Sequence, residues 1–215
     1  MAASKEELAE NYQKKTDREH ILDAPDTYIG LVDKDTTSGY TYGSNGLVWK
    51  SFEWVPGFYK LFDEGIVNCR DHYIRINQKL KKREKNIIPV TKIEINVNKE
   101  TGVISMLNDG NGIDVAKHPE HDLWIPEMIF GHLRTSTNYD KSKKKIVGGK
   151  NGFGFKLVLI WSEWGEIETI DVEKSLLTIV VNVGDNQFEV SIIDIKDGIL
   201  INQYTIKQKK SLYNN

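Results

Sequence analysis

The sequence predicts an α/β fold of two layers, in which a mixed, mostly antiparallel sheet carries helices on one face. Three observations predict this fold. Apolar residues recur at helical spacing after Pro56, strictly alternating residues begin at Thr91, and the chain beyond residue 165 is a series of alternating segments separated by turn signals. Because a sheet with one apolar face must bury that face, we expect the helices to form the covering layer.

The first part of the chain holds one strong helical pattern between less regular segments. Residues 1–25 form a polar arm with a short helical turn at about 6–11, and residues 26–53 are rich in Gly, Thr, Ser and Tyr, which suits extended segments and loops. Pro56 and Gly57 mark a turn, and a helix over 56–84 is expected to follow. Its apolar stripe consists of Phe58, Leu61, Phe62, Ile66, Cys69, Tyr73 and Ile76.

The second part of the chain is predominantly of strand type. Alternation predicts a strand over 91–97 that pairs with 103–107 across a short loop. Two short helices are expected, one over 125–133 because Pro126 suits a first helical turn, and one over 155–161 behind a run of glycines. The last four strands are expected at 166–172, 176–183, 188–195 and 199–206.

Composition bounds the class of protein but gives no activity. The chain has 215 residues, 29 basic and 31 acidic side chains, and one cysteine, Cys69. No window approaches the roughly 18 uninterrupted apolar residues of a membrane span. A lone cysteine excludes an internal disulfide framework and a cysteine-based zinc finger. A net charge of −2 gives no global field that would attract nucleic acid. The basic run at 79–85 indicates a solvated helix end, and a local nucleic-acid contact is the alternative.

Three polar motifs carry the candidate chemistry, and the first lies on the long helix, over residues 63–72. Helical spacing brings Glu64, Asn68 and either Asp71 or His72 to one face, beside the apolar stripe. A carboxylate one turn from a carboxamide can polarise a water and hold a hard cation through oxygen. An ordinary solvated helix face is the alternative on spacing alone.

The second motif, residues 108–113, follows a strand directly. A carboxylate at Asp109 can accept a hydrogen bond from a buried planar donor such as an exocyclic amine, and the two glycines after it let backbone approach a flat ring. A plain turn is the alternative, because Asn-Asp-Gly is common in turns.

The third motif, residues 148–156, reads Gly-Gly-Lys-Asn-Gly-Phe-Gly-Phe-Lys and opens an apolar helix. Backbone N–H groups at such a point can form an anion cradle, to which Lys150 and Lys156 add charge. The order of residues is neither that of a Walker A loop nor that of a dinucleotide fingerprint. A flexible loop is the alternative.

In this order the three motifs resemble the signature of the GHKL ATPases, the superfamily of gyrase-type topoisomerases, Hsp90 chaperones, histidine kinases and MutL. Over residues 12–162 the chain more closely resembles eukaryotic-type (type IIA) DNA topoisomerase II, of cellular or viral origin. The segments that carry this resemblance are 12–16, 19–22, 25–30, 55–57, 62–64, 66–68, 129–131, 135–136, 138–140, 148–149 and 151–152. The resemblance implies the two-layer GHKL (Bergerat) sandwich, with an arm over 1–30 and an ATP-binding domain over 31–215.

The resemblance also implies roles for individual residues. Glu64 matches the general base, Asn68 the magnesium ligand, Asp109 the adenine-recognising position, and Tyr12 an arm residue that reaches the ATP of a partner protomer. His72 departs from the usual Asn of the family, and Phe155 from a small Ala. The other nucleotide-binding positions it implies are Asp71, His72, Gly112, Ile113, Ser136, Thr137, Asn138, Gly149, Lys150, Asn151, Gly152, Phe153, Gly154, Phe155 and Lys156.

The function that the resemblance implies is an ATP-operated gate in a type II topoisomerase, where ATP and Mg²⁺ drive dimer closure and DNA strand passage. We expect DNA to be contacted mainly through a transducer domain and a cleavage core that are absent here, and we expect no membrane partner. The location implied is the nucleus or cytoplasm, or a viral factory or virion. Two alternatives stay open: another GHKL ATPase of Hsp90-like or MORC-like type, and a non-hydrolysing module that uses ATP as a dimerisation switch.

Overall fold

The computed structural model describes residues 4–133, 135, 153–171, 173–182, 188–196 and 199–207. The long predicted helix, both predicted short ones and the helical turn expected at about 6–11 are present, and two further short helices form within residues 1–30. The helices are α1 (Lys5–Asn11), α2 (Asp17–Asp23), α3 (Pro25–Tyr28), α4 (Pro56–Lys81), α5 (Ile125–Gly131) and α6 (Gly154–Ile160).

The strands form antiparallel hairpins and a meander. They are β1 (Asp35–Gly43), β2 (Gly46–Trp54), β3 (Ile93–Asn98), β4 (Val103–Asn108), β5 (Gly165–Asp171), β6 (Leu176–Asn182), β7 (Phe188–Lys196) and β8 (Ile199–Lys207). β1 pairs with β2, β3 pairs with β4, and β5 to β8 form one four-stranded sheet in chain order. Every pairing between these described strands is antiparallel. The α/β class is confirmed, and the described sheet is divided into three parts.

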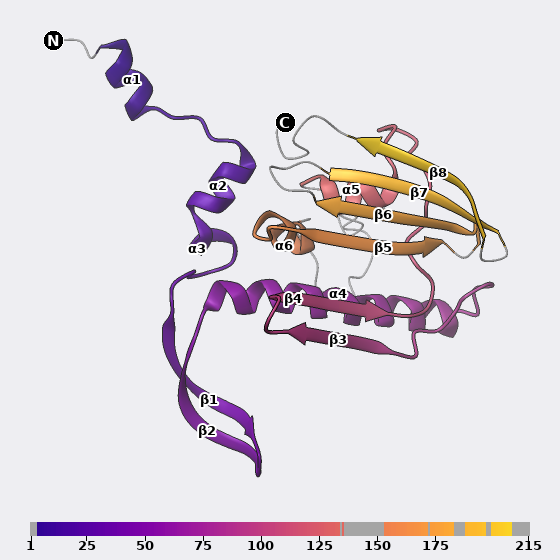
Figure 1. The fold of residues 1–215 in the computed structure, drawn as a ribbon, viewed down its shortest axis with the longest axis horizontal. Coiled ribbons are helices and arrows are strands. Elements are labelled where there is room, and N and C mark those ends of the chain that lie inside the picture. Colours follow the sequence, from indigo (N-terminus) through magenta and orange to yellow (C-terminus); the bar gives the residue numbers. More distant parts are fainter. Residues whose placement is uncertain are drawn as a thin grey trace.

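In the body of the domain, α4 lies behind β3 and β4, and α5 lies behind the four-stranded sheet, whereas α1 to α3 lie to one side (Figure 1). α4 contacts both β4 and α6, while α5 contacts both α6 and β6. α2 also contacts α6, which joins the second helix of the arm to the body of the domain. The β1–β2 hairpin and α1 project away from this body (Figure 1).

Two helices of the arm begin at capping boxes. The hydroxyl of Ser4 accepts a hydrogen bond from the N–H of Glu7, and Thr16 is bonded in the same way to Glu19. In both, the glutamate returns a hydrogen bond to the backbone of the capping residue, which satisfies two N–H groups of the first turn.

The core lies where α2, α6 and the four-stranded sheet meet. It is built from Ile21, Ile29, Val115, Leu157, Leu159, Ile160 and Ile192. The apolar stripe predicted for α4 is only partly buried, because Phe58 and Tyr73 are exposed. α4 instead approaches β4 through Gly65, where a Cβ atom would lie 2.5 Å from the sulfur of Met106. Close approach of the backbone, rather than a full apolar stripe, brings the helix against this strand.

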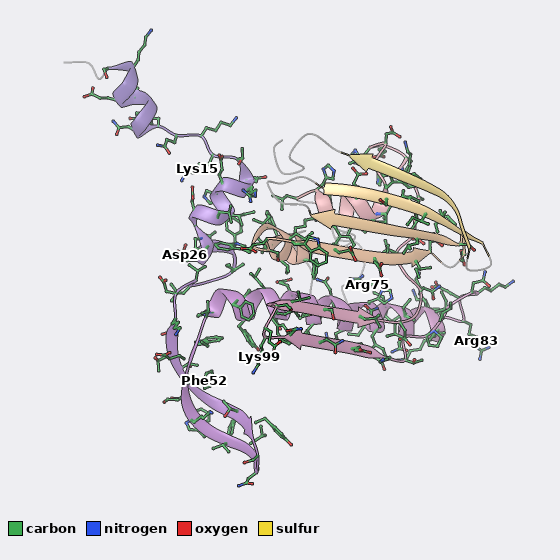
Figure 2. The ribbon with its side chains drawn as sticks, viewed as in Figure 1. Lys15, Asp26, Phe52, Arg75, Arg83 and Lys99 are labelled. Carbon is green, nitrogen blue, oxygen red and sulfur yellow. The ribbon has the colours of Figure 1, made fainter. Side chains whose placement is uncertain are left out.

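Side chains at the far end of α4 are strongly basic. Lys79 and Lys81 lie in its last turn, and Lys82, Arg83 and Lys85 follow. All five are exposed, and Figure 2 labels Arg83 past the end of the helix. Such exposure is expected under both interpretations, a solvated helix end and a local nucleic-acid contact. Within the part of the chain that the structure describes, no helix is long and apolar enough to cross a membrane.

Candidate functional site

The site is built around one face of α4. Glu64 lies two turns into the helix, and its side chain is 20% exposed. Asn68 follows one turn later, and its amide nitrogen donates a hydrogen bond of 2.7 Å to the carbonyl of Glu64. This bond fixes the carboxamide plane and turns its oxygen away from the helix backbone. The helical spacing predicted for these two residues is confirmed.

The start of α6 meets the Glu64 carboxylate. A Cβ atom built on Gly154 would lie 3.1 Å from Oε2 of Glu64, so a side chain there would require the carboxylate to shift by a few tenths of an ångström. One residue on, the ring of Phe155 lies 3.7 Å from a Cβ built on Gly65, and it also packs edge-on against Phe130. Phe153 packs against Tyr28 of α3. The described end of the third motif is therefore seated beside the first motif.

His72 joins α4 to the second motif. Burial lowers the pKa of His72, against the opposing effect of a hydrogen bond with the backbone of Asn111. Its Nε2 atom is buried without a hydrogen-bond partner among the described residues. A neutral imidazole at this position can act as a donor or an acceptor, unlike a lysine or a carboxylate. Asp71 lies next to it and is only 2% exposed, which places it within the protein rather than on the open face of the helix.

The second motif is hydrogen-bonded to the segment that leads into β3. The carboxylate of Asp109 accepts hydrogen bonds from the N–H groups of Thr91 and Lys92 and from the Thr91 hydroxyl. The Thr91 hydroxyl and the Lys92 N–H hold the pKa of Asp109 below its usual range. Asn111 is bonded to the backbone at Asn86 and Ile88. The Asp109 carboxylate is thus committed to the segment that leads into β3.

Because side chains alternate along a strand, Asn108 lies on the opposite side of the chain from the next residue, Asp109. Along β4 the less exposed positions are Ile104, Met106 and Asn108, and Met106 is the one that contacts α4 at Gly65. Successive side chains of a strand point to opposite faces, so Asn108 shares the α4 face with Met106. The residue next to the candidate site is therefore Asn108.

Two polar residues of β5 hold the loop that follows. The N–H of Ile113 donates to the Thr169 hydroxyl at 2.7 Å, and the N–H of Val115 donates to the Asp171 carboxylate at 2.9 Å. Burial alone would raise the pKa of Asp171, but the hydrogen bonds from Val115 and Lys174 outweigh it, and the pKa is lowered. Sequence reasoning did not assign these residues a role. Their signal was a pair of polar residues at i and i+2, on the inward face of a strand.

Gly112 lies between these anchors. Its N–H donates to the carbonyl of Ile170, and a Cβ atom there would collide with that carbonyl and lie 2.7 Å from the Thr169 hydroxyl oxygen. Only glycine fits this contact between the loop and β5.

Lys156 is buried on α6. Its side chain is 3% exposed, and its ammonium donates to the carbonyl oxygen of Thr135 at 3.0 Å and to the hydroxyl at 2.8 Å. Burial lowers the pKa of Lys156 to about 8. Thr135 in turn is bonded to the carbonyls of Met128 and His132 at the end of α5. Lys156 therefore ties α6 to the end of α5.

Several predicted residues are not part of this cluster. Tyr12 follows α1, and its side chain is 78% exposed in the arm. Seven others lie outside the described residues, so their predicted roles stay predictions: Ser136, Thr137, Asn138, Gly149, Lys150, Asn151 and Gly152.

Comparison with known proteins identifies relatives of this chain. No family model matches the chain. DNA topoisomerase 2 of Acanthamoeba polyphaga mimivirus is 46% identical over 173 residues, which is 78% of this chain and 13% of the relative. DNA topoisomerase 2 of Plasmodium falciparum is 46% identical over 163 residues, or 75% of this chain and 11% of the relative. The chain thus spans about an eighth or less of the length of these relatives.

Solved structures agree with the sequence relatives. The ATPase region of Saccharomyces cerevisiae topoisomerase II matches with a TM-score of 0.68 and 35% identity, over 94% of this chain and 48% of that one. The ATPase and transducer domains of Balamuthia mandrillaris DNA topoisomerase II match with a TM-score of 0.70 and 35% identity, over 94% and 47%.

Together, the fold and the relatives define the chain as an ATPase domain of the GHKL class. Its relatives in this class are type II topoisomerases of both viral and eukaryotic origin. The chain belongs to the DNA topoisomerase II family, and it corresponds to part of the ATPase region.

Proposed function

We propose that this chain binds ATP with Mg²⁺ between α4 and the start of α6, and hydrolyses it as the gate domain of a type II DNA topoisomerase. The observation that carries the proposal is the meeting of Glu64 with Gly154, one turn from Asn68. The carboxylate can orient a water, and the carboxamide oxygen can bind a hydrated cation. The glycine leaves room for a phosphate chain to approach both. A coupled ATPase assay of the wild type and a Glu64 variant, with and without DNA, tests it.

The oxygen ligands available near Asn68 are few, and this fits a Mg²⁺ ion that is held mainly by the phosphates of its substrate. No group of three or more His, Cys, Asp or Glu side chains able to hold a metal occurs among the described residues. Mg²⁺ commonly takes one or two protein oxygens and completes its shell with phosphates and waters. Asn68, whose amide nitrogen is already bonded to Glu64, would supply its carboxamide oxygen. When bound, the ion would neutralise charge on the phosphate oxygens.

Glu64 would act on the attacking water. The water oxygen forms a bond to the γ-phosphorus, the bond from that phosphorus to the bridging oxygen of ADP breaks, and the proton of the water passes to the Glu64 carboxylate. Little covalent chemistry falls to the protein in phosphoryl transfer, so most of its contribution is positioning. The bond of Asn68 to the Glu64 carbonyl and the space left by Gly154 support that positioning role.

The adenine contact is proposed for Asn108, and Asp109, the position first predicted, is the alternative that the variants below test. The α4 face of β4 carries Asn108, whereas the Asp109 carboxylate is bonded to Thr91 and Lys92. A carboxamide can accept from the exocyclic amine of adenine and donate to a ring nitrogen.

A pair of variants separates the two residues. Asn108→Ala is expected to weaken ATP binding and reduce the preference for ATP over GTP, while leaving the melting temperature nearly unchanged. Asp109→Ala is expected to lower the melting temperature, because it removes the acceptor for two backbone N–H groups, and to leave the ATP preference of the folded fraction intact. Calorimetric titration with both nucleotides, beside thermal melting, checks this. The reverse pattern would assign adenine recognition to Asp109.

Lys156 is proposed as a cation for the phosphates, and its burial makes this testable by pH. With a pKa of about 8, its ammonium loses its proton as pH rises from 7 to 9, so affinity for a non-hydrolysable ATP analogue should fall across that interval. Lys156→Arg stays charged throughout, so its affinity should be nearly constant with pH, though weaker at pH 7 because the guanidinium differs in shape. Titration at half-unit steps of pH measures this. Parallel profiles for the two proteins would exclude Lys156 as the titrating group.

The role in a larger enzyme rests on the relatives. Exposed Leu8 and Tyr12 on the projecting arm suit contact with a second copy of the chain, and we propose that Tyr12 approaches the nucleotide of that copy (Figure 1). DNA strand passage would be driven by such closure in a homodimer, with most DNA contacts outside this chain. Action in the nucleus or cytoplasm, or in a viral factory or virion, is consistent with eukaryotic and viral relatives.

A further inference from the structure

The carboxylate of Glu64 has a further neighbour that lies outside all three motifs. The ammonium of Lys60, one turn earlier on α4, lies 2.6 Å from Oε1 of Glu64. Its distance to the other nearby carboxylate, Asp63, is 3.9 Å. The short distance is that of a charge-assisted hydrogen bond, so Lys60 is bound chiefly to Glu64.

Helix stability does not account for this pair. Lys60 is the fifth residue of α4, at the end of the helix where a positive charge gains nothing from the helix dipole. A lysine four residues before a glutamate is also the weaker of the two orders for such a pair. With Lys60 42% exposed, a helix pair of this kind contributes little to stability. A residue that breaks local preferences beside a functional carboxylate is a candidate for a functional role.

The two oxygens of Glu64 are held differently. Oε1 is bonded to Lys60, and Oε2 is the oxygen that points to Gly154 at the start of α6. A carboxylate with one oxygen bound keeps a single orientation and presents the other oxygen. That second oxygen is the one nearest the place where the phosphates and the water are proposed to lie.

We propose that Lys60 is a positioning residue for Glu64, whose ammonium fixes Oε1 so that Oε2 faces the attacking water. This inference rests on the proposed ATPase function. Lys60 needs no contact with the nucleotide in this role. Its removal should therefore lower the rate of hydrolysis without changing nucleotide affinity.

The test is a double-mutant cycle that combines Lys60→Met with Glu64→Gln. Lys60→Met keeps the length of the side chain and removes the ammonium; we expect kcat to fall about 10- to 100-fold, the size of effect that misplacing a reacting group causes. The affinity for a non-hydrolysable ATP analogue and the melting temperature should be unchanged. In the Glu64→Gln background the same change should cost nothing further, since the carboxylate it positions is gone. Lys60→Arg should restore a large part of kcat.

Controls separate this inference from the function on which it rests. Lys79→Met removes an exposed lysine from the same helix, far from Glu64, and should leave kcat unchanged. If the wild type hydrolyses ATP and Glu64→Gln does not, but Lys60→Met retains full kcat, the positioning role is wrong and the function stands. A Lys60→Met variant that loses rate equally in both backgrounds would also overturn it. If the wild type itself does not hydrolyse ATP, the proposed function is wrong.

Discussion

Replacing Glu64 by glutamine is expected to lower the turnover of ATP by about 10²- to 10⁴-fold, the usual contribution of a positioned general base. Glutamine keeps the size of the side chain and can still hydrogen-bond, but it cannot take a proton from water. Binding of ATP should persist, because Glu64 is proposed to act on the water and not on the nucleotide. Turnover is measured with a coupled assay and binding by calorimetric titration.

The neighbouring carboxylate gives a matched control. Asp63 lies on the same turn of α4, and its ion pair with Lys60, at 3.9 Å, is the longer of the two. Asp63→Asn removes the same charge one residue away and should leave turnover within about twofold, an effect worth only a few tenths of a kcal/mol. Normal hydrolysis by the Glu64→Gln protein, or equal losses in both variants, would contradict the role assigned to Glu64.

Replacing Gly112 by alanine is expected to destabilise the fold by about 3 kcal/mol, the upper part of the range for overpacking a buried contact. The added Cβ would meet the Ile170 carbonyl and the Thr169 hydroxyl, so the loop after β4 must separate from β5. For a domain of this size the melting temperature should fall by roughly 10 °C. Nucleotide binding should weaken as well, since this loop joins the site to the sheet.

Gly39 supplies the comparison for that experiment. In β1 a Cβ at Gly39 would meet only the Phe52 ring, at an ordinary contact distance of 3.6 Å. Gly39→Ala should therefore change stability by less than about 1 kcal/mol, and alanine can even favour a strand over glycine. If Gly112→Ala melts as the wild type does, the contact between this loop and β5 is not as tight as described.

Most of the secondary structure was predictable because it follows from the local spacing of apolar residues along the sequence. The four-stranded meander follows its alternation closely, and α4 and α6 begin near their turn residues. Two more elements have local signals: Thr16 and Glu19 form a capping box, and Ser44 and Asn45 form the two-residue turn of the β1–β2 hairpin, just before Gly46. The division of the strands into three sheets could not be predicted, because it depends on which strand edges meet in space.

The site was predictable only in part, for the same physical reason. Glu64 and Asn68 share a helix face, so spacing alone relates them. Spacing cannot show that Asp109 is bonded to Thr91, 18 residues earlier, or that Asp171 holds Val115 from 56 residues away. These contacts decide which side chains of the second motif are structural and which remain beside α4.

The central claim is that ATP lies between α4 and the start of α6 with its γ-phosphate at Glu64. A crystal structure of the wild-type chain with Mg²⁺ and a non-hydrolysable ATP analogue tests it most directly. The expected result is a water next to the γ-phosphorus about 3 Å from the Glu64 carboxylate, with the Asn68 carboxamide oxygen about 2.1 Å from the metal. A nucleotide bound elsewhere, or a γ-phosphate too far for a water to bridge it to Glu64, would contradict the claim.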